Sequence, residues 1–536
     1  MALKEKEKTA ISRRHLLKGA VLGSAGVAAA GVLGSARTAA AAVPKKWDMQ
    51  ADVVCIGYGG AGAVTAITAA DLGATVIIIE KQPDDLPTNI RHTPNIRSAT
   101  GSLVCTTDAQ KASDHMFAAS WGKTPRDICD VWGKYAMTNA QWVEKMGGKV
   151  SPSTGVRGEF PNLPGADAID RRSLMGGGPV FFKILDENIK KRKDKIKVVY
   201  EAPGKELVVD AKGTVIGVIA EKGGKKIAIK GKKAVVLTCG GYEWDEELVA
   251  NFFHASPAYF YGNPDNTGDG IRMAAKVGAG MWHFNSIFGR LTPKMPGVKP
   301  GFRGGTPRGF ILVNKYGKRF FRELPLPSSS LPIEACVFEN EVPEFPAIPC
   351  YSVFDDTALK LGEPCSTASK GLLADGKTQQ RFYDWSKGYV DEIKSGFLLK
   401  GETIEELAKV IVADRENEGR MKPEVLRATI ERYNKFCEEK VDHDFERDPK
   451  SLVPVKKGPF YALKMYPGGA MTTGGPKKNA QAQVLDAFNK PIPHLYAAGE
   501  CGSIHGLLYL SPGSNICELL VFGRVAGENA VKEKAV

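Results

Sequence analysis

The stretch from residue 51 to residue 81, ADVVCIGYGGAGAVTAITAADLGATVIIIEK, constrains the fold of this chain more than any other. An apolar run of strand length, Val53 to Ile56, precedes a G-x-G-x-x-G at residues 57–62 and an Ala-rich helical pattern. A second apolar run ends at Glu80, which is placed to accept hydrogen bonds from an adenosine ribose. An ordinary α/β protein can carry a Gly-rich turn, but this complete order indicates a dinucleotide-binding βαβ unit.

The small residues of this motif have separate physical roles. Gly57 permits a tight turn, Gly59 lets the backbone approach a pyrophosphate, and Gly62 lets the helix pack against the strand. The pyrophosphate is expected beside Gly60 and Ala61, because the N–H groups and the positive dipole end of the helix point at it there.

Length, charge and cysteine content restrict the remaining possibilities. A chain of 536 residues is long enough for two or more domains. The net charge is +13; the first 42 residues carry seven Lys or Arg against two Glu, so +8 remains for the rest. The sequence contains no basic block interleaved with aromatic residues, so we expect no binding to nucleic acid. None of the ten cysteines forms a C-x-x-C pair, so we expect no metal or haem site, and a separate electron carrier.

The first 42 residues have the pattern of an export signal. Ser12 to Lys18, SRRHLLK, resembles a twin-arginine motif, a weakly apolar stretch follows at residues 19–34, and Ala39 to Ala42 offers cleavage sites. The apolar stretch is too short and too rich in Gly and Ala for a stable membrane span. We therefore expect export by the twin-arginine route to the periplasm or another extracytoplasmic space.

The rest of the chain divides by its periodicity. Residues 43–285 hold the βαβ unit, a helical pattern at 125–146, and a β-meander between 197 and 242. Residues 286–450 are rich in Pro and Gly and then helical, with a capping box at residues 403–406. We expect this part to be an inserted second domain, and residues 451–536 to return to the first domain.

Six segments then point to a known family: residues 57–62 with Glu80, TCGG at 238–241, TGDG at 267–270, NKYGKRF at 314–320, GPFYA at 458–462 and LYAAGE at 495–500. Together they resemble the fumarate reductase/succinate dehydrogenase flavoprotein family, in particular its soluble exported branch with urocanate reductases and 3-ketosteroid dehydrogenases. The resemblance implies an α/β fold, with a discontinuous Rossmann-like FAD-binding domain and an inserted α+β capping domain. It also implies non-covalent FAD, because no His stands where the membrane-bound relatives attach flavin.

The resemblance assigns the residues that bind FAD position by position. It places residues 98–102 near the pyrophosphate and flavin, and Asp269 near the adenosine end. It places Glu500 and residues 514–516 against the ribityl chain and ring. The expected set is Gly57, Gly59, Gly60, Ala61, Gly62, Glu80, Lys81, Ser98, Thr100, Gly101, Ser102, Gly240, Asp269, Gly499, Glu500, Ser514, Asn515 and Ile516.

Departures from the family pattern affect the substrate. Pro327 stands where fumarate reductases carry the arginine that donates a proton, and the His before the segment at 469–475 is missing. YLSPGSN at residues 509–515 replaces a segment whose arginine grips a carboxylate. Fumarate and succinate are therefore not the expected substrates. The segment with Tyr509 followed by Pro-Gly resembles that of the ketosteroid dehydrogenase branch, in which a tyrosine polarises a substrate carbonyl.

These observations predict an oxidoreductase that reduces the C=C bond of an α,β-unsaturated carbonyl compound by hydride transfer from flavin N5. Tyr509, Arg303, Arg308 and His505 are the candidate catalytic residues, with a separate donor such as a periplasmic cytochrome c. A phenol at Tyr509 donates to a developing enolate, or else packs with its hydroxyl on a backbone group. Two other functions stay open: a 3-ketosteroid-type dehydrogenase and a non-catalytic electron-transfer flavoprotein subunit.

Overall fold

The computed structural model describes residues 41–84, 101–153, 155, 158–304, 309–324, 330–372, 379–381 and 383–536. The expected export signal therefore lies almost entirely outside the described residues, as do Ser98, Thr100 and Arg308. Within the ranges just given, no helix is long and apolar enough to cross a bilayer. The same ranges hold no group of three or more His, Cys, Asp or Glu placed to bind a metal ion.

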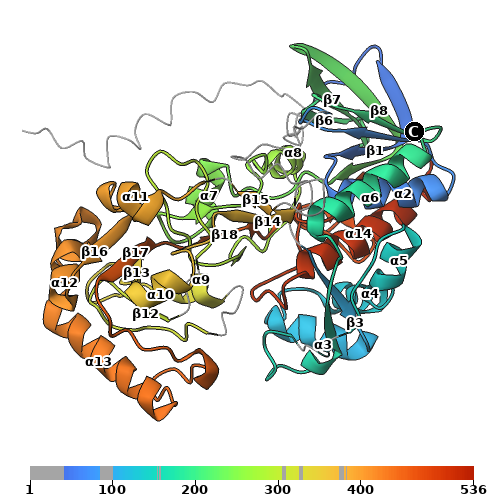
Figure 1. The fold of residues 1–536 in the computed structure, drawn as a ribbon. Coiled ribbons are helices and arrows are strands. Elements are labelled where there is room, and N and C mark those ends of the chain that lie inside the picture. Colours follow the sequence, from blue (N-terminus) through green and yellow to red (C-terminus); the bar gives the residue numbers. More distant parts are fainter. Residues whose placement is uncertain are drawn as a thin grey trace, which may run out of the picture. The chain divides into compact units, whose positions relative to one another are not determined.

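A mainly parallel sheet is the core of the first part of the fold (Figure 1). Its strands run in the order β21, β22, β8, β1, β2, β5, and β6 and β7 continue from β8 as an antiparallel meander. The bounds are β1 Met49–Ile56, β2 Val76–Ile79, β5 Ile196–Val199, β6 Gly204–Val209, β7 Val215–Lys222, β8 Lys225–Leu237, β21 Gln483–Leu485 and β22 Pro491–Ala497. Parallel pairs join β1 to β2 and β8, β2 to β5, and β22 to β8, so the two ends of the chain share one sheet.

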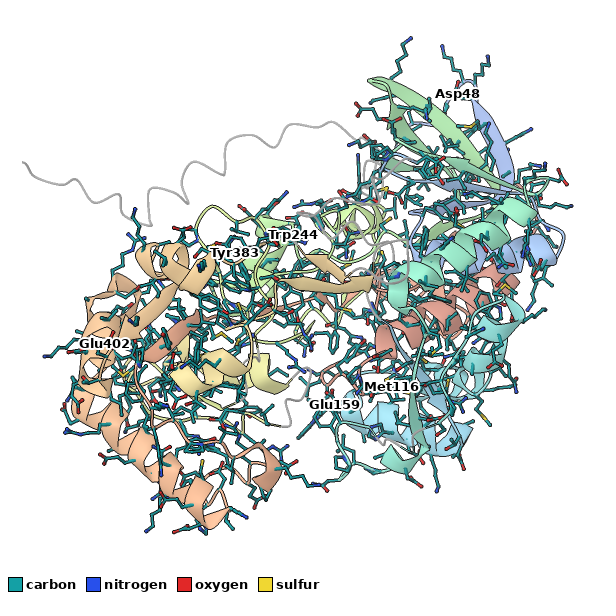
Figure 2. The ribbon with its side chains drawn as sticks, in the orientation of Figure 1. Asp48, Met116, Glu159, Trp244, Tyr383 and Glu402 are labelled. Atoms are coloured by element: carbon teal, nitrogen blue, oxygen red, sulfur yellow. The ribbon has the colours of Figure 1, made fainter. Side chains whose placement is uncertain are left out.

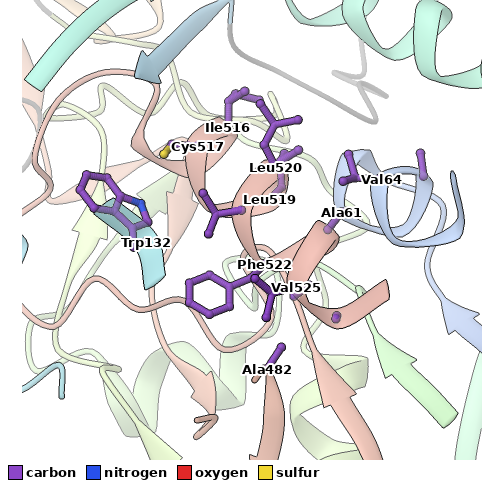
Figure 3. Packing of buried hydrophobic residues seen from close by; sticks show 14 of the residues in the cluster. Ala61, Val64, Trp132, Ala482, Ile516, Cys517, Leu519, Leu520, Phe522 and Val525 are labelled. Atoms are coloured by element: carbon purple, nitrogen blue, oxygen red, sulfur yellow. The ribbon is translucent and has the colours of Figure 1, made fainter. Parts of the chain in front are cut away.

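Helices pack closely around this sheet. Helix α2 (Gly60–Asp71) lies against α14 (Ser514–Ala530), and their apolar side chains interlock (Figure 3). A Cβ on Gly523 would lie 2.9 Å from Val64 Cγ1, so the absence of a side chain permits this close approach. The neighbouring helices are α3 (Ala109–Ala119), α4 (Arg126–Ala136), α5 (Asn139–Lys145) and α6 (Gly177–Lys191).

An antiparallel sheet with two helices forms the inserted part. Its order is β12 (Phe310–Val313), β13 (Cys350–Asp355), β17 (Phe460–Met465) and β16 (Leu398–Gly401). Helices α12 (Ile404–Ala413) and α13 (Pro423–Glu439) cover one of its faces. Strand β17 lies after residue 450, where the sequence predicts the return to the first domain, yet it belongs to the sheet of the inserted part. Periodicity predicts a strand there but does not show which sheet the strand joins.

Short elements connect the two sheets and position the loops of the site. Two-residue strands pair β9 (Tyr259–Phe260) with β18 (Gly468–Gly469), β11 (Ile287–Phe288) with β19 (Met471–Thr472), and β10 (Met281–Trp282) with β20 (Gly475–Pro476). The other elements are β3 (Ser102–Thr106), β4 (Ile169–Ser173), α7 (Glu246–Phe252), α8 (Asp269–Lys276), α9 (Ser330–Ala335), α10 (Asp356–Leu361), β14 (Ala368–Leu372), β15 (Gln379–Arg381) and α11 (Val390–Lys394).

The α/β fold class predicted from the sequence is confirmed. Two local predictions differ in detail. The helical pattern at 125–146 is two helices, α4 and α5, separated at residues 137–138. Within the predicted meander, one long strand, β8, spans Lys225–Leu237, and residues 238–241 follow it outside the strand. The capping box is confirmed, because Thr403 Oγ1 accepts the Glu406 N–H at 3.1 Å.

Candidate cofactor and active site

The candidate site is a cavity of about 370 Å³ at the sheet edge where β1, β2, β8 and β22 end. Residues that directly follow each of these strands line it, as expected for ligands of open α/β sheets. The sequence-predicted residues in its lining are Gly57, Gly59, Gly60, Ala61, Glu80, Lys81, Gly240, Asp269, Gly499, Glu500, Asn515, Ile516 and Arg303.

The glycine turn forms a tight cradle at the start of α2. Gly57 has a φ of 106°, and a Cβ there would lie 2.5 Å from the carbonyl oxygen of Thr238. A Cβ on Gly62 would lie 2.1 Å from the carbonyl oxygen of Gly57. Gly62 itself does not line the cavity; its lack of a side chain lets the first turn of α2 sit directly on the preceding loop.

The end of β2 presents a fixed carboxylate. The Tyr58 N–H donates to Glu80 Oε2 at 2.7 Å, and the Gln82 N–H donates to Glu80 Oε1 at 2.8 Å. Each carboxylate oxygen keeps a second lone pair for a ribose hydroxyl. Lys81, the next residue, makes an ion pair with Asp269 at 2.8 Å. Asp269 is the first residue of α8, and it therefore lies at the same end of the cavity as Glu80.

A second carboxylate, Glu500, lies where β22 ends. Its Oε1 atom is buried and has no hydrogen-bond partner among the described residues. A buried acceptor of this kind is costly unless a ligand satisfies it, and a hydroxyl of a sugar-like chain does so. The cradle at Gly57, the carboxylate of Glu80 and this orphaned oxygen together fit a dinucleotide such as FAD.

Two arginines lie in the same cavity. Arg290 follows β11, and Arg303 bridges to Ser366 through its backbone. Neither guanidinium makes an ion pair within the part of the chain that the structure describes. Burial and the charge of Arg303 lower the pKa of Arg290 to about 10. The charge of Glu159 partly offsets these effects on Arg290, but neither arginine makes an ion pair with a described residue, and an anionic or strongly polar ligand would stabilise the two cations.

A phenol and an apolar wall accompany these arginines. Burial raises the pKa of Tyr261, although Arg303 and Arg290 partly offset this rise, so the phenol keeps its proton at neutral pH. Phe288 and Met471, from the paired strands β11 and β19, supply apolar surface. Glu159, labelled in Figure 2, also lines this cavity.

Tyr509 lies one layer behind the lining. Its ring stacks on Phe288 with 3.7 Å between centroids, and its hydroxyl accepts the backbone N–H of Asn515 at 2.7 Å. The hydroxyl therefore caps the first turn of α14, which was the alternative to a catalytic role. A contact between Tyr509 and substrate stays a prediction.

His505 and three of the expected cofactor residues also lie outside the lining. Burial lowers the pKa of His505 to about 3, so the ring is neutral at physiological pH. Ser514 hydrogen-bonds the carbonyl of Ser511 at 2.8 Å within the turn before α14. Gly101 and Ser102 lie at the start of β3, and Ser102 packs against Gly513 of the same turn.

Sequence reasoning missed several residues of the site. Tyr261 and Arg290 stand in loops without a recognisable motif, and Gln82 follows the predicted Glu80 by two positions. Glu243 lies just behind Glu500. Its place shortly after β8 was the available signal, because polar residues that follow parallel strands gather at the carboxyl end of the sheet.

Comparison with known proteins gives a consistent result. The profile of the FAD binding domain family matches residues 52–516. A fumarate reductase (cytochrome) from Shewanella frigidimarina is 29% identical over 502 residues, which cover 90% of this chain and 77% of the relative. A urocanate reductase from Eggerthella lenta is 27% identical over 504 residues, covering 91% and 75%.

The fold itself has a match among solved structures. The 3-ketosteroid Δ1-dehydrogenase from Sterolibacterium denitrificans, in complex with 1,4-androstadiene-3,17-dione, superposes with a TM-score of 0.74. The match covers 90% of this chain and 99% of that protein at 19% identity, so it shows a shared fold.

Proposed function

Because this chain belongs to the FAD binding domain family and is a fumarate reductase-like oxidoreductase acting on CH–CH bonds, we propose that it reduces an α,β-unsaturated carbonyl compound. The substrate in this proposal has an aromatic or alicyclic body and an anionic or carbonyl end. Bound FAD supplies the hydride at N5. The residues of the chain supply orientation, charge stabilisation and a proton.

The observation that carries this proposal is the pair Arg290 and Arg303, which share the cavity with the nucleotide cradle and make no ion pair with a described residue. Forked guanidinium donors suit a carboxylate or a carbonyl oxygen. As the C=C bond accepts hydride, negative charge builds on that oxygen, and fixed cations stabilise it in a site of low dielectric. Phe288 and Met471 supply the surface for the apolar body.

The proton that completes the reduction needs a donor at the same end of the cavity. Tyr261 is the protonated phenol that lines it. Tyr509, Arg303 and Arg308 remain the donors that the sequence predicts. His505 is a weak candidate, because a neutral imidazole with a pKa of about 3 holds no readily released proton.

The test is a substrate panel with the purified holoprotein under anaerobic conditions and reduced viologen as the donor. The panel pairs conjugated aryl enoates and enones with their non-conjugated isomers and saturated analogues. We expect viologen oxidation with the conjugated members only, since only these place developing charge on an oxygen.

Three outcomes separate the alternatives. Oxidation of a 3-ketosteroid with an artificial acceptor, and no enoate reduction, would identify a dehydrogenase of the ketosteroid type. Fast electron exchange with a cytochrome, and no turnover of any alkene or ketone, would identify a non-catalytic electron-transfer subunit. Equal rates on conjugated and non-conjugated alkenes would contradict the carbonyl requirement.

Export and the electron donor complete the proposal. The SRRHLLK sequence at residues 12–18 supports the twin-arginine route, which carries folded proteins and so suits a cofactor acquired before export. A separate donor, such as a periplasmic cytochrome c, fits a chain without a haem-attachment motif. Non-covalent attachment of FAD is part of the same proposal.

A further inference from the structure

Two carboxyl groups meet at the wall of the nucleotide cavity, one in the lining and one behind it. Glu243 follows β8 by six residues, and Glu500 follows β22 by three. A Cβ on Gly241 would lie 2.4 Å from Glu500 Oε1, 2.4 Å from Thr472 Oγ1 and 2.7 Å from Glu243 Oε2. These three side chains therefore converge on one point, which only a glycine backbone leaves open.

Few hydrogen-bond donors surround the pair. The backbone N–H of Thr472 acts on both carboxyl groups and lowers their pKa, which burial nevertheless keeps raised. Asn266 Nδ2 donates to Glu243 Oε1 at 2.8 Å and, more weakly, to Glu500 Oε2 at 3.4 Å. Thr472 Oγ1 donates to Glu243 Oε2 at 3.2 Å. Glu500 Oε1 has no partner among the described residues, and neither carboxyl group has a Lys, Arg or His ion-pair partner there.

Two buried carboxylates without a cation cannot both remain ionised. Glu243 is only 4% exposed, and burial raises its pKa to about 7. Burial also raises the pKa of Glu500, and the neighbouring charge of Glu243 raises it further. One proton between the two groups removes the repulsion and supplies the hydrogen bond that the donors around them do not.

We propose that Glu243 is a positioning residue for FAD. Glu243 shares one proton with Glu500, so the pair carries a single negative charge and the Glu500 carboxyl is held at the cavity wall. The shared proton does not depend on the substrate, so this inference goes beyond the proposed function. Glu243 acts through Glu500, since Glu500 lines the cavity and Glu243 does not.

The shared proton links FAD affinity to pH. FAD excludes water from the cavity and brings a negatively charged pyrophosphate into it, so bound FAD favours the form of the pair with one charge rather than two. The pKa of the pair is therefore higher in the FAD-bound protein than in the free protein. The contribution of the shared proton to FAD affinity is fully present below the pKa of the free protein, and it is lost as the pH rises through the pKa of the bound protein. Affinity for FAD therefore falls with rising pH.

Three other titratable groups act on the pair: the phenols of Tyr242 and Tyr509 and the thiol of Cys501. Burial raises the pKa of both phenols, so they remain neutral across the range of interest. Cys501 is a buried neighbour of Glu500 along the chain, and Cys501→Ser separates its effect from that of the carboxyls.

The experiment measures the Kd of the apoprotein for FAD by flavin fluorescence, from about pH 6 to about pH 9 at constant ionic strength. We expect the wild-type Kd to rise by up to about tenfold per pH unit between the pKa of the pair in the free protein and its higher pKa in the complex. Glu243→Gln keeps the size and hydrogen bonding of the side chain, and its Kd is expected to be independent of pH. Two control variants are expected to keep the wild-type slope: Cys501→Ser, and Glu246→Gln, which changes an exposed carboxyl on α7 outside the cavity lining.

A wild-type Kd that is constant over this range would overturn the proposal, and so would a wild-type slope in Glu243→Gln. If Glu243→Gln binds no FAD at any pH, Glu500→Gln is measured instead: a constant Kd supports the shared proton, and a retained slope overturns it. Because these measurements contain no substrate, their outcome is independent of the reaction proposed above.

Discussion

Tyr509→Phe separates a structural from a catalytic tyrosine. The substitution keeps the ring that stacks on Phe288 and removes the hydroxyl that accepts the Asn515 N–H at 2.7 Å. That N–H is in the first turn of α14 and loses its acceptor in a buried site, which costs about 1–3 kcal/mol. We expect the free energy of unfolding in urea to fall by that amount.

The kinetic expectation follows from the same geometry. Because the hydroxyl of Tyr509 is outside the cavity lining, kcat is expected to stay within a few-fold of wild type. Affinity for FAD is expected to fall modestly, because Asn515 and Ile516 of the loosened turn line the cavity. The assays are urea unfolding followed by circular dichroism, FAD titration, and steady-state kinetics on the best substrate of the panel.

Tyr496→Phe is the matched control. Tyr496 is buried on β22 and donates its hydroxyl to Glu533 Oε1 at 2.7 Å, away from the cavity lining. It should lose a comparable free energy of unfolding and keep both FAD affinity and kcat. A fall in kcat of about 10²-fold or more in Tyr509→Phe, with unchanged stability, would refute the capping role and make the phenol an acid or oxyanion donor.

The remaining predictions concern the substrate end, the cofactor and export. Arg290→Met is expected to raise the KM for an anionic substrate by about 10- to 100-fold, the effect of losing one charged hydrogen bond. The exposed control Arg272→Met is expected to keep the wild-type KM. An unchanged KM in Arg290→Met would show that this arginine does not bind the substrate. Acid precipitation is expected to release yellow flavin into the supernatant, and colour retained in the pellet would show a covalent bond. Changing Arg13 and Arg14 to Lys is expected to leave an uncleaved cytoplasmic precursor, and normal processing of the double mutant would contradict the twin-arginine route.

The cofactor side of the site was predictable because it is encoded locally. Residues 51–80 contain a strand, a turn, a helix and a strand in one continuous segment, and each glycine role follows from its spacing. The prediction that FAD is the cofactor, and that the chain resembles the fumarate reductase flavoproteins, is confirmed by the family match and the relatives. Glu500 was placed by the family resemblance, through the short motif LYAAGE at residues 495–500.

The substrate side was less predictable because its residues come from different loops. Tyr261, Arg290 and Met471 belong to segments that meet only through two-residue strand pairs, whose pairing has no sequence signature. Glu243 is separated from Glu500 by more than 250 residues, and only the parallel pairing of β22 with β8 brings the two strand ends together. Such encounters depend on sheet order rather than on local periodicity.

The motif NKYGKRF at residues 314–320 shows how a family signature can be structural. Arg319 donates to Glu323 and Asp442 at 2.7 Å, with side chains only 3%, 0% and 0% exposed, and Glu323 also lies 3.5 Å from Arg447. Removing one partner of such a buried network lowers the free energy of unfolding by about 3–5 kcal/mol, so the motif has a structural role whatever the reaction.

The proton-donating arginine of the fumarate reductases follows this motif, and Pro327 stands at its position in this chain. The chain thus has a buried ion network within the inserted part, but no arginine at the position where the family resemblance expects the proton donor. A reductase with this scaffold needs cations and a proton donor from elsewhere. Arg290, Arg303 and Tyr261 all line the cavity, and in the function proposed above they supply the cations and the proton for a substrate other than fumarate.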